Sequence, residues 1–126
     1  MKKTNKLVLF CNPNGAYLEL FPFETTYCQF YIEQGYNVGI WNYRGYSKSV
    51  GAPSLAHNKH DALNVYDFIT DKGYDISIVH GYSIGGPTSV YLASQRKVDL
   101  LVADRTFSSL YQVRVFKRSF PKSMVK

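Results

Sequence analysis

Residues 76–86 read Ile-Ser-Ile-Val-His-Gly-Tyr-Ser-Ile-Gly-Gly, an apolar run that leads into a glycine-rich turn. The Gly-x-Ser-x-Gly part of this stretch has the pattern of a nucleophile elbow, a sharp strand-to-helix turn that exposes a serine hydroxyl. Residues two positions before and after the serine crowd such a turn, and glycine relieves the crowding because it has no Cβ atom. We therefore expect Ser83 to be a nucleophile, with Gly81 and Gly85 clearing the turn around it.

Strand-like and helix-like segments alternate on both sides of this turn. Periodicity and turn-forming residues predict strands over residues 6–11, 37–43, 75–80 and 99–103, and helices over residues 17–34, 54–72 and 84–95. Ser54 is the expected N-cap of the second helix. Gly35 and Gly73, which follow the first two helices, can adopt the positive φ of a helix end. This alternation predicts an α/β fold, with a parallel sheet covered by helices on both faces.

The composition excludes several classes of protein. The chain has 126 residues, of which 45% are apolar and 19% charged, so it is one domain or part of one rather than a disordered chain. Its net charge of +6 comes largely from lysines and arginines near the two ends. We interpret these as solubilising charge, with contact to anionic lipid or nucleic acid as the alternative. No nucleic-acid-binding motif is present, so no nucleic-acid partner is expected.

No metal, cofactor or disulfide framework is expected. The two cysteines, Cys11 and Cys28, lie in apolar surroundings and lack partners at metal-ligand spacing, so they are interpreted as small core residues. The apolar stretch at residues 7–11 is too short for a signal peptide, and no run of about 18 apolar residues predicts a transmembrane helix. A cytoplasmic or membrane-peripheral location is therefore expected.

Three further segments resemble one family, in the same order along the chain. Residues 7–16 (Leu-Val-Leu-Phe-Cys-Asn-Pro-Asn-Gly-Ala) resemble strand 3 and the oxyanion loop of eukaryotic α/β-hydrolase-domain proteins, which include membrane-associated serine lipases and depalmitoylases. Residues 41–51 (Trp-Asn-Tyr-Arg-Gly-Tyr-Ser-Lys-Ser-Val-Gly) resemble that family's loop after strand 4. Residues 104–110 (Asp-Arg-Thr-Phe-Ser-Ser-Leu) resemble its segment after strand 6. The resemblance covers about residues 6–112. It implies the strand order 4-3-5-6 in that fold's numbering, and a single partial domain over residues 1–126, from strand 3 to just after strand 6.

The resemblance also implies roles for individual residues. Ser83 would attack the substrate carbonyl, and the backbone N–H groups of Ile84 and Asn14 would form the oxyanion hole. Pro13 has no N–H, which favours Asn14 as the second donor, with Gly15 as the next choice. The alternative for this segment is a plain loop of turn-forming residues.

The chain departs from the family in its histidines. An α/β-hydrolase needs an acid and then a histidine general base after the nucleophile, but His57, His60 and His80 all precede Ser83. We interpret His57 and His60 as surface residues and His80 as a core or pocket-wall residue, so no base histidine is expected in this chain. Asp104 is interpreted as the capping carboxylate of a turn, and the role of triad acid is the alternative.

These features together favour a serine hydrolase that acts on acyl esters or thioesters of lipids or lipidated proteins and is truncated before the acid and histidine of its triad. Peripheral membrane contact is expected in the full-length protein. The alternative is a catalytically inactive α/β-hydrolase-like binding or scaffold module. A nucleotide-binding domain is disfavoured because no Gly-x-Gly-x-x-Gly follows the first predicted strand. The chain is interpreted as a fragment, a truncated gene product or a degenerate paralogue.

Overall fold

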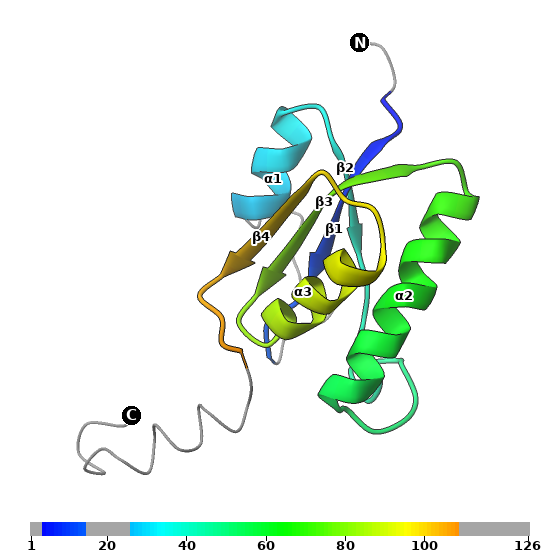
Figure 1. Ribbon diagram of the computed structural model, residues 1–126, viewed down its shortest axis with the longest axis vertical. Helices are drawn as coiled ribbons and strands as arrows, with labels where there is room; N and C mark the ends of the chain where they lie inside the picture. Colours follow the sequence, from blue (N-terminus) through cyan, green and yellow to red (C-terminus); the bar gives the residue numbers. More distant parts are fainter. Residues whose placement is uncertain (1–3, 15–25, 109–126) are drawn as a thin grey trace, which may run out of the picture.

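Strands and helices alternate along the chain in a computed structural model that describes residues 4–14 and 26–108 (Figure 1). The elements follow one another in the order β1 (Lys6–Cys11), α1 (Thr26–Glu33), β2 (Asn37–Ile40), α2 (Leu55–Asp71), β3 (Asp75–Tyr82), α3 (Gly85–Gln95) and β4 (Leu100–Asp104). The predicted α/β class is confirmed. None of the described helices is long and apolar enough to cross a membrane.

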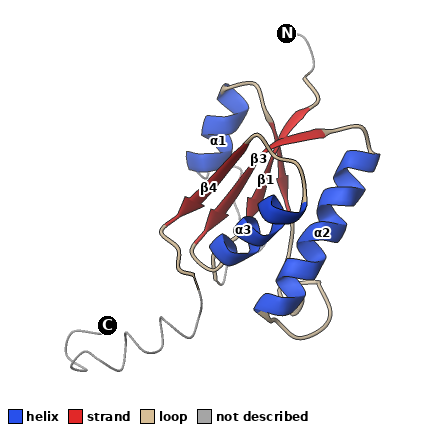
Figure 2. Cartoon of the chain, in the orientation of Figure 1, coloured by secondary structure: helices blue, strands red, loops and turns tan. Residues whose placement is uncertain are grey.

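The four strands form one parallel sheet in the order β2-β1-β3-β4 (Figure 2). This is the order 4-3-5-6 in the numbering of the α/β-hydrolase fold, as the family resemblance implied. Because all four strands are parallel, their carboxyl ends meet at one edge of the sheet, where open α/β sheets bind their ligands.

Alternate residues of β1 enter two different cores, one on each face of the sheet. Leu7, Leu9 and Cys11 pack with Ala62 of α2 and Leu92 of α3. Val8 points to the opposite face and packs with Tyr31 of α1 and Ile78 of β3. Figure 1 shows the same division, with α1 on one side of the sheet and α2 and α3 on the other. The central strand is therefore buried on both faces, as expected for a parallel sheet.

Three predicted strands end at different residues in the structure, and the one predicted over residues 99–103 differs least, since β4 is shifted from it by one residue. The strand predicted over residues 37–43 leaves the ladder at Ile40, the partner of Phe10, and β1, its neighbour in the described sheet, ends one residue later at Cys11. The strand predicted over residues 75–80 instead continues to Tyr82, since β4 supplies partners for its last two residues. Half of the first predicted helix, residues 17–25, lies outside the described residues, and α1 accounts for nearly all of the other half.

The start of α2 agrees with the predicted cap. Ser54 has extended backbone angles, and its hydroxyl accepts a hydrogen bond of 3.0 Å from the backbone N–H of His57. This satisfies one of the N–H groups that a helix leaves unpaired at its first turn. The cap fixes the start of α2 at the same edge of the sheet as the carboxyl ends of the strands (Figure 1).

Candidate functional site

The turn between β3 and α3 holds Ser83 in a left-handed backbone conformation, with φ of 54°. Residues other than glycine rarely adopt this conformation, which costs roughly 1–2 kcal/mol for an L-amino acid. Hydrogen bonds hold both the N–H and the carbonyl of Ser83. The backbone N–H of Ser83 donates to the carbonyl of Asp104 at 3.0 Å, and its own carbonyl accepts from Gly86 N at 3.0 Å and from Thr106 Oγ1 at 2.6 Å. The segment after β4 therefore stabilises the strained turn.

Glycines surround Ser83 because other backbone and side-chain atoms approach too closely for a Cβ atom. A Cβ at Gly85 would overlap the carbonyl oxygen of Cys11 in β1. A Cβ at Gly81 would overlap the side chain of Ser89 and lie 2.5 Å from the carbonyl oxygen of Gly85. The first turn of α3 can thus rest directly on the sheet, which is the close packing that a sharp strand-to-helix turn requires.

The loop after β1 is held by tyrosines from the segment after β2. Asn12 is fully buried, and its side-chain amide donates to the carbonyl of Trp41 at 2.9 Å. The Tyr43 hydroxyl donates to the carbonyl of Asn12 at 2.7 Å, and the Tyr46 hydroxyl donates to Asn14 Oδ1 at 2.8 Å. Sequence reasoning assigned no role to these tyrosines, although both lie in the segment that resembles the family's loop after strand 4.

An ion pair joins the loop after β2 to α2. Arg44 donates from Nε and from its terminal amino group to the two carboxylate oxygens of Asp61, each at 2.7 Å. This bidentate geometry is the strongest form of such a pair. The hydrogen bond from Arg44 holds the pKa of the Asp61 carboxyl below its usual range. The pair fixes the position of the loop that carries Tyr43 and Tyr46.

A pocket of about 300 Å³ lies at the carboxyl edge of the sheet. It is lined by Asn14, Tyr46, Pro53, Ser54, Leu55, Asn58 and Ile84. Asn14 and Ile84, the two predicted oxyanion-hole residues, thus line the same pocket although they lie far apart in the sequence. Ile84 is also the residue directly after Ser83. Gly15, the other predicted donor, lies outside the described residues.

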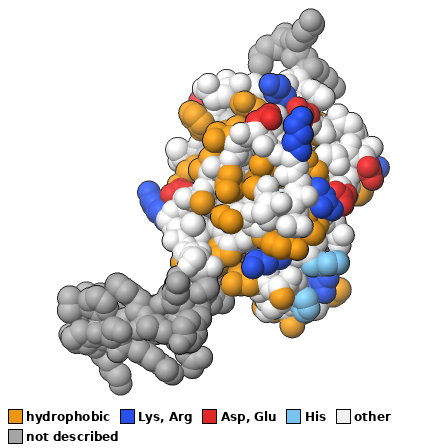
Figure 3. Space-filling view, viewed as in Figure 1, with side chains coloured by type: hydrophobic (Ala, Val, Ile, Leu, Met, Phe, Trp, Pro, Cys, Tyr) orange, Lys and Arg blue, Asp and Glu red, His pale blue; other side chains and the backbone are white. Residues whose placement is uncertain are grey.

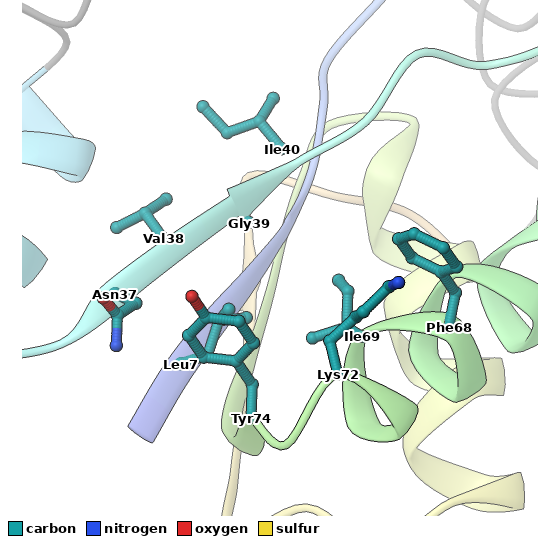
Figure 4. A pocket seen from close by; sticks show the side chains of 9 residues that line it. All are labelled: Leu7, Asn37, Val38, Gly39, Ile40, Phe68, Ile69, Lys72 and Tyr74. Carbon is teal, nitrogen blue, oxygen red and sulfur yellow. The ribbon is translucent and has the colours of Figure 1, made fainter. Parts of the chain in front are cut away.

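A larger pocket, of about 480 Å³, lies at the opposite edge of the sheet (Figure 4). It is lined by residues next to the starts of three strands, Leu7 of β1, Asn37 of β2 and Tyr74 before β3, together with the last turns of α2. Its other walls are the apolar side chains of Phe68 and Ile69 and the residues of the edge strand β2. None of the predicted catalytic residues lines it.

His80 lies in an aromatic box on the α1 side of the sheet. It is 3% exposed, its Nδ1 lies 2.8 Å from the Tyr31 hydroxyl, and the rings of Phe10 and Tyr27 pack against it at 4.9 and 5.1 Å between centroids. Burial lowers the pKa of His80, partly offset by the charge of Asp104. No hydrogen bond between His80 and Ser83 is present, so the geometry supports the interpretation of His80 as a wall residue.

Asp104 ends β4 and makes contacts typical of a structural carboxylate. Its Oδ2 accepts a hydrogen bond of 2.8 Å from Tyr27 and lies 3.9 Å from Nε2 of His80. The hydrogen bond to Asp104 is the main reason that the pKa of Tyr27 is raised. The backbone carbonyl of Asp104 accepts the hydrogen bond from the N–H of Ser83 that is described above. These contacts support the structural interpretation of Asp104 over the role of triad acid.

The remaining candidates of the sequence analysis lie away from Ser83. His57 and His60 are exposed on α2, where Figure 3 shows histidine side chains at the surface. Cys11 and Cys28 are buried and unbridged, and burial raises the pKa of the Cys11 thiol to about 12, so it remains protonated. In the described part of the chain, no three His, Cys, Asp or Glu side chains come together as a metal site.

Similar proteins agree with this architecture. The chain matches no protein-family model. It is 34% identical over 115 residues to a multifunctional-autoprocessing repeats-in-toxin of Vibrio cholerae, a match that covers 85% of this chain and 2% of the toxin. It is 30% identical over 97 residues to the lysophosphatidylserine lipase ABHD12 of Gallus gallus, covering 72% of this chain and 25% of the lipase. The chain therefore spans a quarter or less of the length of these two relatives.

A solved structure has the same fold over most of the described chain. A lipase-esterase related protein from Clostridium acetobutylicum superposes with a TM-score of 0.58 and 22% sequence identity, covering 79% of this chain and 40% of that one. At this level of identity the likeness shows the fold alone. The parallel sheet and this shared fold show that the chain has an α/β-hydrolase fold, and the sequence similarity to the lipase shows that it resembles the α/β-hydrolase-domain lipases.

Proposed function

We propose that this chain carries the nucleophile and the oxyanion hole of a serine hydrolase that acts on acyl esters or thioesters of lipids or lipidated proteins. The observation that carries the proposal is the strained turn at Ser83, which lies beside a pocket lined by Asn14 and Ile84. A strained serine between a strand and a helix, cleared by glycines, is the arrangement that a nucleophile elbow needs. The lipase among the relatives supports the substrate class.

In the proposed reaction, Ser83 Oγ forms a bond to the carbonyl carbon of the substrate, and the bond to the alcohol or thiol breaks. The serine proton leaves with the alcohol or thiol through a general base. Water then hydrolyses the acyl-serine, which releases the carboxylic acid and restores the hydroxyl. The negative charge that develops on the carbonyl oxygen would be stabilised by the backbone N–H groups of Ile84 and Asn14. Neither of these N–H groups donates a backbone hydrogen bond to another residue within 4–14 and 26–108.

We also propose that this chain contains no histidine that acts as the general base. All three histidines precede Ser83, two of them are exposed on α2, and the third is enclosed by aromatic rings. Without the base, a serine hydrolase keeps only the acceleration that binding and the oxyanion hole provide. The chain alone should therefore show negligible turnover. In the full-length protein, the proposed lipid substrates imply peripheral contact with a membrane surface.

The test is labelling with a fluorophosphonate probe, followed by mass spectrometry of the modified peptide. We expect a slow adduct on Ser83 that forms faster when free imidazole is added as a substitute base, and no adduct in Ser83→Ala. Ser94→Ala, which alters an exposed serine on α3, is the matched control and should label like the wild type.

Two outcomes would overturn parts of the proposal. No adduct on Ser83 even with imidazole would favour the inactive binding or scaffold module, which the missing histidine base already supports. Robust hydrolysis of p-nitrophenyl butyrate by the chain, lost in Ser83→Ala, would show instead that a general base is present in it.

A further inference from the structure

The peptide unit between Ser83 and Ile84 joins the strained turn to the proposed oxyanion hole. Its N–H group belongs to Ile84 and is one of the two proposed donors, whereas its carbonyl belongs to Ser83. That carbonyl accepts two hydrogen bonds, from Gly86 N at 3.0 Å and from Thr106 Oγ1 at 2.6 Å. A trans peptide is planar and its carbonyl and N–H point in opposite directions, so a group that fixes the carbonyl also fixes the direction of the N–H.

The two hydrogen bonds to this carbonyl have different origins. The bond from Gly86 joins residues three positions apart, where the chain enters α3, and so belongs to the local turn. The bond from Thr106 spans 23 positions, and its length lies at the short end of the range for hydroxyl donors. A strong donor on the carbonyl also polarises the peptide unit, which strengthens the N–H on its other side. Thr106 is therefore the tertiary contact that acts on the Ile84 N–H.

The backbone around Thr106 is arranged for this contact. The chain bends directly after β4 at Arg105, which has a left-handed φ of 47°. The side chain of Thr106 then lies against the first turn of α3, where a Cβ atom at Gly86 would overlap it. The Gly-x-Ser-x-Gly pattern does not require a glycine at position 86. The close approach of Thr106 supplies a reason for this glycine.

We propose that Thr106 is a positioning residue for the oxyanion hole. Its hydroxyl holds the Ser83 carbonyl, and the peptide plane then directs the Ile84 N–H to the place where negative charge develops on the substrate. Thr106 acts through this peptide unit rather than on the substrate itself. The inference rests on the proposed function, because only a reaction at Ser83 gives the Ile84 N–H a developing charge to stabilise.

The first test measures the direction of the Ile84 N–H bond by its residual dipolar coupling in isotope-labelled chain. Thr106→Val removes the hydroxyl and nearly keeps the shape of the side chain, so we expect the coupling to change. Thr106→Ser keeps the hydroxyl and should retain the wild-type coupling. The matched control is Thr70→Val, because Thr70 Oγ1 also donates to backbone carbonyls, those of Tyr66 at 3.1 Å and Asp67 at 3.0 Å, but on α2. It should leave the Ile84 coupling unchanged.

The second test measures fluorophosphonate labelling of Ser83, with imidazole present, over a range of probe concentrations. We expect Thr106→Val to lower the maximal labelling rate about tenfold, less than the roughly hundredfold or more that complete loss of an oxyanion donor costs. The half-saturating probe concentration should stay the same, because the oxyanion hole acts in the transition state. Thr106→Ser and Thr70→Val should label like the wild type.

An unchanged Ile84 coupling in Thr106→Val, or a maximal labelling rate equal to that of the wild type, would overturn the inference. If the wild type itself is not labelled but the coupling changes as expected, the nucleophile is rejected and Thr106 keeps its role in orienting this peptide unit. One check needs no variant, so it decides even if Thr106→Val does not fold. In the wild type, the Thr106 hydroxyl proton should exchange with water more slowly than that of the exposed Ser47, and equal exchange would also overturn the inference.

Discussion

The two edges of the sheet differ in how their backbone turns are built. At the carboxyl edge, the described non-glycine residues with positive φ are Ser47, Ser83 and Arg105, which follow β2, β3 and β4. At the amino edge, the turns before β2 and β3 use Gly35 and Gly73, where an added Cβ atom would meet nothing within 4 Å. Strain is therefore confined to the edge that carries the candidate site, as is common at functional sites.

Of the two pockets described above, the smaller one has the larger share of polar side chains in its lining. The pocket at the amino edge is larger, about 480 against 300 Å³, but it is formed mainly by apolar side chains beside the edge strand β2. The smaller pocket collects Asn14, Tyr46 and Asn58 next to the strained turn. Convergent polar groups and close backbone approach, rather than volume, mark the candidate site.

The sharpest test of this difference places the same substitution at both edges. Gly85→Ala should lower the free energy of unfolding by about 3 kcal/mol or prevent folding, because the methyl group would overlap the backbone carbonyl of Cys11 and neither can move far. Gly39→Ala, in the amino-edge pocket, should change it by less than about 1 kcal/mol. Its methyl group would meet only the flexible ends of Leu7, Ile69 and Leu9, at 3.2, 3.4 and 3.5 Å. Urea melts followed by circular dichroism measure both, and equal losses would contradict the close packing at Ser83.

Removing one tyrosine hydroxyl at each edge of the sheet should give a smaller difference in the free energy of unfolding. Tyr43→Phe should cost about 1–2 kcal/mol, because it leaves the buried carbonyl of Asn12 without its partner. Tyr74→Phe should be nearly neutral, since Tyr74 is 42% exposed in the amino-edge pocket. Thermal melts of the two variants decide this, and a Tyr43→Phe protein as stable as the wild type would show that the tyrosine does not hold the loop after β1.

The carboxyl half of the sheet should also give the chain a pH dependence. Burial lowers the folded-state pKa of His80 below its usual value near 6.5, so the unfolded chain takes up the proton first as the pH falls. Stability should therefore decrease from about pH 7 downward until the lowered folded pKa is passed. His80→Gln should flatten this slope, whereas His60→Gln, at an exposed position, should not. Denaturant melts at several pH values compare the slopes, and an unchanged slope in His80→Gln would contradict the assignment.

The smallest expected effects are at Ser83 itself. Ser83→Ala should alter stability by less than about 0.5 kcal/mol, because it keeps the left-handed backbone and removes only the hydroxyl of a half-buried residue. Ser83→Gly should be more stable than Ser83→Ala by roughly 0.5–1 kcal/mol, since glycine adopts positive φ without strain and loses part of that gain to backbone entropy. Calorimetry resolves differences of this size, and a Ser83→Gly protein less stable than Ser83→Ala would argue against backbone strain at the turn.

Local sequence determined much of the fold. The apolar run before Ser83 and the glycines around it predicted a strand, a turn and a helix, and β3 and α3 lie there. The predicted helix over residues 54–72 agrees with α2 and its caps to within one residue at each end. These features depend on residues that are neighbours in the chain, through periodicity, capping and steric freedom, so they can be read without the fold.

Tertiary structure alone decided which distant residues meet. The ladder of β2 ends at Ile40, close to the end of β1, and the pattern of residues 41–43 gives no sign of it. The hydrogen bonds of Tyr43 and Tyr46 to the loop after β1 span more than 30 positions, and that of Thr106 to the serine turn spans 23. The sequence by itself determined the existence and order of the strands and helices and the position of the serine turn, but not where every strand ends. The shared pocket of Asn14, Asn58 and Ile84 depends on strand order and register, which bring residues together through contacts that no local stretch specifies.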